Sequence, residues 1–345
     1  MRPRLVRRAG GWSLGCLQGG VGLAFAALAW SLAATASGDE RGDARPPAAY
    51  PPVTVQVCGA PARFDTPPRR AVTHDVNLTE MFLALDLEDR MAGYSGIRSS
   101  KTVAPEYRAR LERLPLLSDK GLSLEALVGA GADFVFGGWS YGFQPGEVTP
   151  EALARFGIGS YILSESCIRV GARRKVSLED TFDDLLNLGR IFRIEARARA
   201  FIDRQRAELA KIAAALSGVK TRPRVFVYDS GETVPLTTGR FAMPQAMIEL
   251  AGGANIFDDL PNSWMRANWE DVIHRDPEWI VIIDYGQPNA AGKIAFLLAR
   301  QELAQVTAIR ERRFVTLDYA AATPGPRNVE SVRALAKALH PEAFR

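Results

Sequence analysis

Hydrophobic and polar residues follow one another along this chain in blocks that are typical of an α/β protein. Beyond residue 65, short apolar runs of strand length are separated by segments whose apolar residues recur at helical spacing. The predicted strands are residues 71–73, 91–94, 116–117, 133–136 and 157–163 in the first half, and residues 224–228, 279–283 and 314–317 in the second. Because strands that alternate with helices form parallel sheets, the pattern predicts an α/β fold.

A hairpin and two helices complete the pattern at the ends of the chain. Residues 53–64 alternate apolar and polar positions around Cys58-Gly59, which predicts an opening β-hairpin. Helices are expected at residues 79–87, after the first strand, and at residues 329–339.

A long helical tract in the middle of the chain predicts a connection between two domains. Ser177 begins it, with Asp180 at the position of a capping box. We expect Gly189 to break the tract, so that a second helix covers residues 194–216, about 33 Å at 1.5 Å per residue. The predicted domains are an N-terminal lobe over residues 53–193, a bridging helix over residues 194–217 and a C-terminal lobe over residues 218–345.

The sequence repeats one supersecondary unit in two distant places. Residues 123–136 and 268–281 each put a capping residue before a Glu, form a short amphipathic helix, pass an acidic turn and enter an apolar strand. The corresponding acids are Glu125 with Glu270 and Asp133 with Glu278. A single repeat at this distance is not a solenoid. It predicts two similar, Rossmann-like α/β lobes that face each other across a ligand cleft.

The first 36 residues have the three parts of a secretory signal peptide. A segment with four arginines precedes an apolar core at residues 21–30, and Ala34-Thr35-Ala36 is a small-x-small cleavage site. Retention as a membrane anchor is the alternative, and Arg7-Arg8 is a weak indication of twin-arginine export. Residues 37–52, rich in Pro, Gly and Ala, are expected to be a disordered lead-in. The sequence thus predicts an exported protein with no further membrane insertion.

The formal charge of +4 lies entirely in this leader. The chain has 43 Lys and Arg and 39 Asp and Glu; the leader holds four of the Arg and no acid, so 39 basic residues remain against 39 acidic ones. A neutral chain lacks the electrostatic footprint of a nucleic-acid-binding protein. We therefore expect no nucleic-acid partner.

Two cysteines, Cys58 and Cys167, remain if the leader and its Cys16 are removed. An even pair of thiols in an oxidising compartment suggests a disulfide. It would close a loop of about 110 residues, for which chain-entropy models give an upper figure of about 4 to 5 kcal/mol. Two buried free thiols are the alternative.

Five motifs together give the chain a resemblance to a known family. They are Asn77-Leu-Thr-Glu80, Leu122-Ser-Leu-Glu125, Leu250-Ala-Gly-Gly-Ala-Asn-Ile-Phe257, Trp269-Glu270 and Pro326-Arg327. Over about residues 66–340 the chain resembles the periplasmic substrate-binding proteins of the iron-siderophore and cobalamin class of ABC importers. The resemblance implies two α/β lobes joined by a single rigid backbone helix, with the ligand in a shallow cleft between them. The pattern of strands and helices leads to the same architecture.

The resemblance also implies a docking role for Glu125 and Glu270. In the family, one carboxylate on each lobe enters an arginine pocket on one of the two permease subunits. A bidentate contact between Arg and carboxylate suits this role. The alternative is that each Glu only offsets the dipole of its own helix, but the symmetric placement of the two favours docking.

Candidate ligand-binding residues lie beyond the carboxyl ends of the predicted strands, where ligands bind in such folds. Aromatic side chains together with Arg suit a flat or anionic metal chelate, through stacking and charge-assisted hydrogen bonds. The candidates are His74, Asn77, Tyr94, Trp139, Tyr141, Arg240, Trp264, Tyr285, Tyr319 and Arg327. Core packing is the alternative for any single aromatic, and packing at the start of the last helix is the alternative for Arg327.

Neither a metal site nor catalysis is expected. His74 stands where relatives that bind bare zinc or manganese place a ligand, but three further partners are not evident in the sequence. A hydrolase nucleophile elbow, a redox-active Cys pair and a zinc-protease His pair are also not expected. We therefore expect no cofactor.

The sequence leads us to expect a periplasmic, monomeric binding protein that captures a metal chelate and delivers it to an ABC permease. The ligand classes that fit are iron-siderophore complexes, cobalamin and other corrinoids, and haem. A binder of bare metal ions on the same fold is one alternative, which stoichiometric metal in chelate-free protein would indicate. A two-lobed chelatase is the other, and turnover of metal and tetrapyrrole would indicate it.

Overall fold

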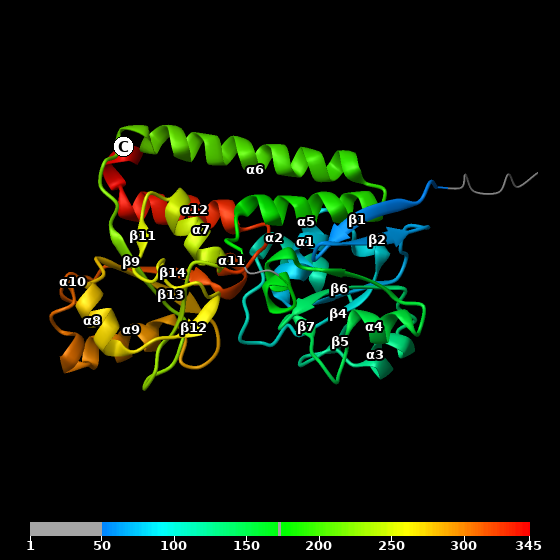
Figure 1. Ribbon diagram of the computed structural model, residues 1–345, viewed down its shortest axis with the longest axis horizontal. Coiled ribbons are helices and arrows are strands. Elements are labelled where there is room, and N and C mark those ends of the chain that lie inside the picture. The colour runs from blue at the N-terminus through cyan, green and yellow to red at the C-terminus, as the bar shows by residue number, and fades with distance from the viewer. Residues whose placement is uncertain (1–49, 172–173) are drawn as a thin grey trace, which may run out of the picture. The chain divides into compact units, whose positions relative to one another are not determined.

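The computed structural model describes residues 50–171 and 174–345, so the predicted leader at residues 1–36 and most of the lead-in at residues 37–52 lie outside the described residues. Within them, two α/β lobes are joined by the long helix α6, Glu195–Ala215 (Figure 1). We call the part before α6 the N lobe and the part after it the C lobe. This arrangement confirms the predicted fold class.

The N lobe contains one sheet whose strands are all parallel. Its order is β5-β4-β3-β6-β8, and the short strand β7 also pairs with β6. The strands are β3 Ala71–His74, β4 Met91–Ser95, β5 Leu116–Ser118, β6 Phe134–Trp139, β7 Gly142–Phe143 and β8 Gly159–Ile162, and the helices are α1 Val76–Ala84, α2 Pro105–Leu111, α3 Leu124–Gly129, α4 Pro150–Ala154 and α5 Leu178–Ile191. The central strands β3 and β6 are almost wholly buried, as expected when helices cover both faces of a parallel sheet.

The C lobe has a parallel sheet of four strands in the order β11-β9-β13-β14, and an antiparallel pair, β10 with β12. The strands are β9 Arg224–Tyr228, β10 Leu236–Thr238, β11 Ala254–Asn255, β12 Trp264–Arg266, β13 Trp279–Asp284 and β14 Phe314–Asp318, and the helices are α7 Met243–Leu250, α8 Trp269–Arg275, α9 Ala290–Ala299, α10 Thr307–Arg310, α11 Tyr319–Ala322 and α12 Asn328–Leu339. Strand and helix alternate in both lobes, as the sequence pattern predicted.

Helix α6 runs along both lobes, with α5 beside it in the N lobe and α12 beside it in the C lobe (Figure 1). One apolar core continues through these helices from lobe to lobe; it includes Phe182 and Leu188 of α5, Ile202 of α6, and Val332 and Leu335 of α12. Two smaller cores pack on the other face of each sheet. Because the lobes share a close-packed core, they can rotate against each other only through a small angle.

The break between α5 and α6 is not where we expected it. Gly189 lies inside α5, so that prediction is wrong. A Cβ atom at Gly189 would come within 2.5 Å of the Ala198 Cβ, so the glycine instead permits the close approach of α5 and α6. The chain reverses just after α5, with Arg193 in the left-handed region at φ 61°. Helix α6 begins within one residue of the predicted start, while the boundaries of the lobes stay a prediction.

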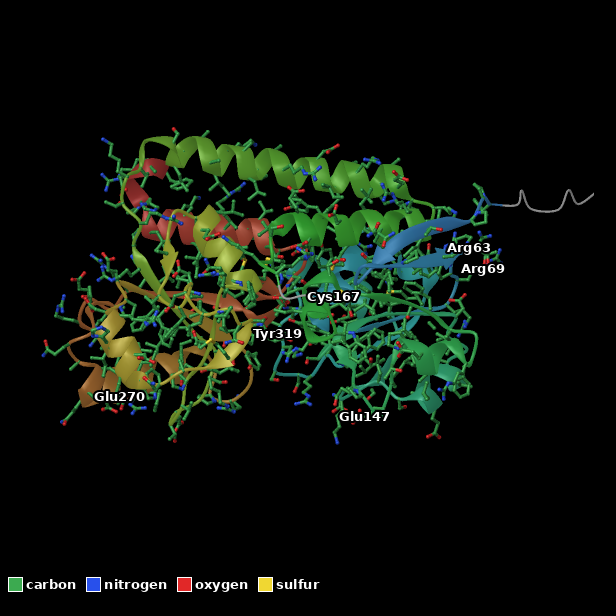
Figure 2. All side chains as sticks on the ribbon, viewed as in Figure 1. Arg63, Arg69, Glu147, Cys167, Glu270 and Tyr319 are labelled. Atoms are coloured by element: carbon green, nitrogen blue, oxygen red, sulfur yellow. A yellow bond between two sulfur atoms is a disulfide. The ribbon has the colours of Figure 1, made fainter. Side chains whose placement is uncertain are left out.

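The opening hairpin is present and is tied to the N lobe by a disulfide. Strands β1, Val53–Val57, and β2, Ala60–Phe64, pair antiparallel across a turn in which Cys58 and Gly59 both have positive φ. Cys58 is bonded to Cys167, which follows β8 (Figure 2). The structure thus contains the predicted disulfide, across a sequence separation of 109 residues.

The repeated sequence unit begins in the same way in both lobes. The Ser123 side chain caps α3 by accepting the N–H of Ala126, and the Asn268 side chain caps α8 by accepting the N–H of Asp271. Both caps have extended backbone, which is typical of residues that begin a helix.

The acidic turn of the repeat also has one role in both lobes. The Asp133 carboxylate accepts the backbone N–H groups of Arg69 and Arg70, at 2.8 and 2.9 Å, and the Glu278 carboxylate accepts that of Arg224 at 2.9 Å. Each acid therefore fixes the start of the first strand in its own sheet. The register predicted from the sequence is confirmed by these contacts.

Candidate functional site

A cleft of about 180 Å³ lies where the carboxyl ends of strands from both lobes meet. Its lining residues are Trp139, Ser140, Tyr141, Glu165, Ser166, Ile168 and Arg169 of the N lobe, and Asp229, Leu236, Ser263, Trp264, Tyr285, Tyr319 and Thr323 of the C lobe. Pockets that enclose drug-sized ligands usually have roughly 300 to 1,000 Å³. This cleft therefore encloses a small ligand, or only one part of a bulky one.

Five aromatic side chains form much of the cleft wall, and all five are candidates from the sequence: Trp139, Tyr141, Trp264, Tyr285 and Tyr319. Tyr285 and Tyr319 directly follow β13 and β14, which are paired through Asp284 and Asp318. The two tyrosines consequently lie side by side, with ring centroids 5.2 Å apart and planes inclined at 62°. Figure 2 shows Tyr319 between the two lobes.

Trp139 has contacts with both the cleft and the N-lobe core. It lines the cleft, and its ring also packs edge-on against Phe143 with centroids 6.2 Å apart. Its side chain is neither fully buried nor fully exposed. The predicted ligand contact and the alternative of core packing are thus compatible for this residue.

An aspartate occupies the equivalent position at the end of the first strand in each lobe. Ala71 of β3 pairs with Phe134, and Val225 of β9 pairs with Trp279, which are equivalent positions in the repeat. Four residues further on, directly after each strand, the chain places Asp75 and Asp229, whose side chains are both buried. Strands β3 and β9 therefore present one carboxylate each at the carboxyl edge of their sheets.

Asp75 is neutralised by a lysine and joined to the other lobe. Lys101 Nζ lies 2.5 and 2.6 Å from the two Asp75 carboxylate oxygens. The Tyr319 hydroxyl of the C lobe donates to Asp75 Oδ2 at 2.9 Å, and the same Lys101 ammonium lies 4.0 Å from the centre of the Tyr319 ring. These three side chains connect the lobes, and one of them, Tyr319, also lines the cleft.

Glu165 forms a second polar connection between the lobes. Its carboxylate accepts the backbone N–H of Met243, at the start of α7 in the C lobe, at 3.0 Å, and the Tyr141 hydroxyl at 3.2 Å. Burial raises the pKa of Glu165 to about 7, although both hydrogen bonds oppose this shift. Near neutral pH, Glu165 is therefore present in both its neutral and its charged form.

Five candidates from the sequence do not line the cleft. His74 is buried and its Nδ1 lies 2.9 Å from Ser95 Oγ; burial lowers its pKa to about 4. Asn77 is fully buried on α1 and donates to the Pro324 carbonyl. Tyr94, on β4, is half-buried and does not line the cleft. Arg240 is exposed and donates to the Asp258 carbonyl at 2.6 Å.

Arg327 is the fifth of these, and it is packed at the start of α12, as the alternative reading held. Its Nε lies 2.9 Å from Glu80 Oε2, and its Nη1 lies 2.9 Å from Asp318 Oδ2. Its Nη2 donates to the Thr102 carbonyl at 3.0 Å. Because Glu80 and Thr102 belong to the N lobe, Arg327 joins the lobes instead of facing a ligand.

Several polar residues near the cleft were absent from our candidates, among them Asp75, Lys101, Glu165, Arg169 and Asp229. Three of these, Asp75, Glu165 and Asp229, nevertheless lie on loops that we expected beyond the carboxyl ends of the strands. The repeat contained a signal for Asp75 and Asp229, since extending its register back to the first strand of each lobe makes them equivalent. Lys101 comes from an irregular loop between β4 and α2 and has no such signal.

One expectation about sequence motifs was wrong. The stretch from Gly138 to Gly142 has the Gly-x-Ser-x-Gly spacing of a nucleophile elbow, and its Ser140 has a positive φ of 69° and lines the cleft. A catalytic serine needs a base within hydrogen-bond reach. Within residues 50–171 and 174–345 no hydrogen bond joins Ser140 to a histidine, and His74 is bonded to Ser95 instead. The motif here supports a turn in the cleft wall.

Where the structure describes the chain, it holds no group of three or more His, Cys, Asp or Glu side chains suited to a metal ion. No helix in that part of the chain combines the length and the apolar character that crossing a bilayer requires.

The two acids predicted to dock with a permease are both exposed. Glu125 lies in the first turn of α3 and Glu270 in the first turn of α8. These helices lie in different lobes, on the side of the molecule away from α6 (Figure 1), and Glu270 is visible there in Figure 2. The docking role itself stays a prediction.

Comparison with known proteins gives a consistent assignment. A periplasmic binding protein from Veillonella parvula is 28% identical, with a TM-score of 0.74 over 84% of this chain and 98% of that one. An ABC-type Fe³⁺-hydroxamate transport system from Saccharomonospora viridis is 22% identical, with a TM-score of 0.72 over 84% and 100%. A periplasmic haem-binding protein from Pseudomonas aeruginosa is 25% identical, with a TM-score of 0.65 over 79% and 93%.

The family model described as "Periplasmic binding protein" matches residues 72–321, which is more than half of the chain. The match spans both lobes, α6 and almost all of the cleft lining. It confirms the resemblance seen in the sequence motifs. The chain belongs to the periplasmic binding protein family.

Proposed function

We propose that this protein is the substrate-binding component of an ABC importer and that its cleft binds one metal chelate for delivery to the permease. The observation that carries the proposal is the aromatic wall, to which both lobes contribute at the carboxyl ends of their strands. Aromatic faces suit the apolar surface of an organic chelate. The names of the similar proteins from S. viridis and P. aeruginosa support ligands of this kind.

The connection between the lobes supports binding in a largely preformed cleft. The shared core and the contacts Asp75–Tyr319, Glu165–Met243 and Glu80–Arg327 hold the lobes in one arrangement. Affinity then comes mainly from side chains that are already in place. The proposed work is reversible binding without catalysis, by a monomer in the periplasm, where the family acts.

We expect Trp139→Ala to weaken chelate binding by about 1 to 3 kcal/mol, the range for losing a large aromatic contact. The test is isothermal titration of the purified protein with a panel of ferric trihydroxamate complexes, cobalamin and haem. Whichever compound binds the wild type is then compared between variants.

Trp279→Ala is the matched control for this test. Trp279 is also half-buried, but it lies at the amino end of β13, away from the cleft. The Trp279→Ala variant should have a lower melting temperature and an unchanged affinity for the chelate. If Trp139→Ala lowers only the melting temperature as well, Trp139 is a core residue and its role in the cleft is refuted. If no chelate binds the wild-type protein, the proposed function itself fails.

A further inference from the structure

We propose that the cleft selects a ligand that carries a positively charged group, which lies against Asp229 and the aromatic wall. This inference rests on the proposed function, because it names the charge of the chelate that the same site binds.

In the N lobe, the protein itself supplies the cation. Asp75 has Lys101 within 2.6 Å of both carboxylate oxygens, and Tyr319 contributes a hydroxyl to the carboxylate and a ring face to the ammonium. A buried carboxylate is stable only when it is paired or hydrogen-bonded. Lys101 thus neutralises the buried carboxylate at that position, and Tyr319 donates a hydrogen bond to it.

In the C lobe, the equivalent acid has no cation in direct contact. Asp229 Oδ1 accepts the hydroxyls of Tyr285 and Ser230, both at 2.7 Å, and these donors are neutral. Considering residues 50–171 and 174–345, no Lys, Arg or His nitrogen comes within 4.0 Å of Asp229, and Oδ2 accepts no hydrogen bond. Asp229 is only 3% exposed and lines the cleft. Its free oxygen is therefore available to a group that enters the cleft.

The basic side chains closest to Asp229 do not replace that cation. Lys293 Nζ lies 4.5 Å from the centre of the Tyr285 ring, much as Lys101 lies over Tyr319. Its ammonium nevertheless donates to the carbonyls of Ile283 and Tyr285, at 2.6 and 3.3 Å, forms no ion pair with Asp229 and does not line the cleft. Arg169 is the one basic residue among the lining residues, and it is solvent-exposed. The acids of the lining, by contrast, are buried, with Glu165 at 7% exposure. The acidic side chains of the lining are thus buried, whereas its basic side chain is exposed.

The aromatic side chains of the cleft wall also favour a positively charged ligand. The faces of tyrosine and tryptophan rings attract cations electrostatically, and the attraction increases when water is excluded. One face of Tyr319 already holds Lys101 and one face of Tyr285 holds Lys293, so Trp139 and Trp264, which line the same cleft, offer the ring faces for a ligand cation. A ferric tricatecholate, with its multiple negative charges, would place like charges against Asp229. A chelate with an ammonium group would instead complete the pairing.

The test compares two probes that differ by one charge. The first is the ferric complex of a linear trihydroxamate that ends in a primary ammonium, and the second is the same complex with that amine acetylated. Binding to the whole mature protein is followed by tryptophan fluorescence and by calorimetry. The cationic complex should bind at least roughly tenfold more tightly, because acetylation removes its contact with Asp229. Equal affinity, or tighter binding of the acetylated complex or of a ferric tricatecholate, would overturn the inference.

Asp229→Asn should reduce this preference to about unity, because the amide keeps the shape of the side chain without its charge. Glu147→Gln is the control, since Glu147 is an exposed acid on an N-lobe loop outside the cleft (Figure 2). A preference that persists in Asp229→Asn contradicts the assignment.

A metal-free pair separates this inference from the proposed function. Pentylammonium and N-pentylacetamide carry the same charge difference without a chelate. If both ferric complexes fail to bind but pentylammonium binds in preference to the amide, the chelate function fails and the cation preference stands. If neither pair shows a preference for its cationic member, the inference is wrong.

Discussion

Charge reversal of Glu125 and Glu270 is expected to abolish uptake of the chelate. Both carboxylates are exposed in the first turns of α3 and α8, one on each lobe, so they can meet the two subunits of a permease together. An Arg that replaces either Glu would place like charges at the proposed arginine pocket and cost several kcal/mol at the interface. The measurement is uptake of radiolabelled chelate by cells that carry only the double variant Glu125→Arg, Glu270→Arg.

The same variant should retain ligand affinity and melting temperature, because exposed acids of a first helical turn contribute only about 0.3 to 1 kcal/mol to stability. Glu330→Arg is the matched control. Glu330 is also an exposed acid in a first turn, but its helix, α12, lies beside α6 on the other side of the molecule (Figure 1). Normal uptake by the double variant would refute docking, and a large loss of affinity would move these residues into the cleft.

Arg327→Met should destabilise the protein by about 3 to 5 kcal/mol, the range for removing one partner of a buried ion pair. Glu80 is 0% exposed, and besides Arg327 it is held by the N–H of Ala104. Without the guanidinium its carboxylate would be buried and uncompensated. Urea denaturation, followed by circular dichroism, measures the change in the free energy of unfolding.

The size of this effect should depend on pH. Burial raises the pKa of Glu80 from 4.5 to about 7, against the opposing attraction of Arg327. A carboxyl whose pKa is higher in the folded state contributes stability that is present below pH 4.5 and is lost as the pH rises through 7. The cost of Arg327→Met should therefore be smaller at pH 5 than at pH 8. The added substitution Glu80→Gln should remove this pH dependence, and equal costs at both pH values would contradict the role of the pair.

The sequence was sufficient for the fold because its signals are local. The caps Ser123 and Asn268 and the acids Asp133 and Glu278 depend on neighbours whose positions follow from the strand pattern, and they were predicted in the right register. The break at Gly189 was not predictable in this way. Glycine ends a helix in one context and lets two helices approach in another, and only the position of Ala198 distinguishes the two.

For the cleft, sequence reasoning located loops but not the direction of their side chains. Trp139, Tyr141 and His74 were all expected just after a predicted strand. Trp139 and Tyr141 line the cleft, whereas His74 is buried and pairs with Ser95. Arg327 was proposed to contact the ligand because of its charge. Its ion-pair partner is instead Glu80, which lies in the other lobe. Contacts between lobes depend on the tertiary arrangement and leave no periodic pattern in the sequence. For that reason the bridging residues, such as Lys101, became visible only in the structure.

Native mass spectrometry of the mature protein, purified without added ligand from the periplasm of its own host, tests the central claim most directly. The claim is that the cleft between the lobes holds one small organic chelate. We expect a second species whose mass exceeds that of the polypeptide by one chelate, and we expect this species to be less abundant in Trp139→Ala and unchanged in Trp279→Ala. Bare polypeptide alone, even under conditions that induce uptake, or an extra mass that Trp139→Ala retains unchanged, would contradict it.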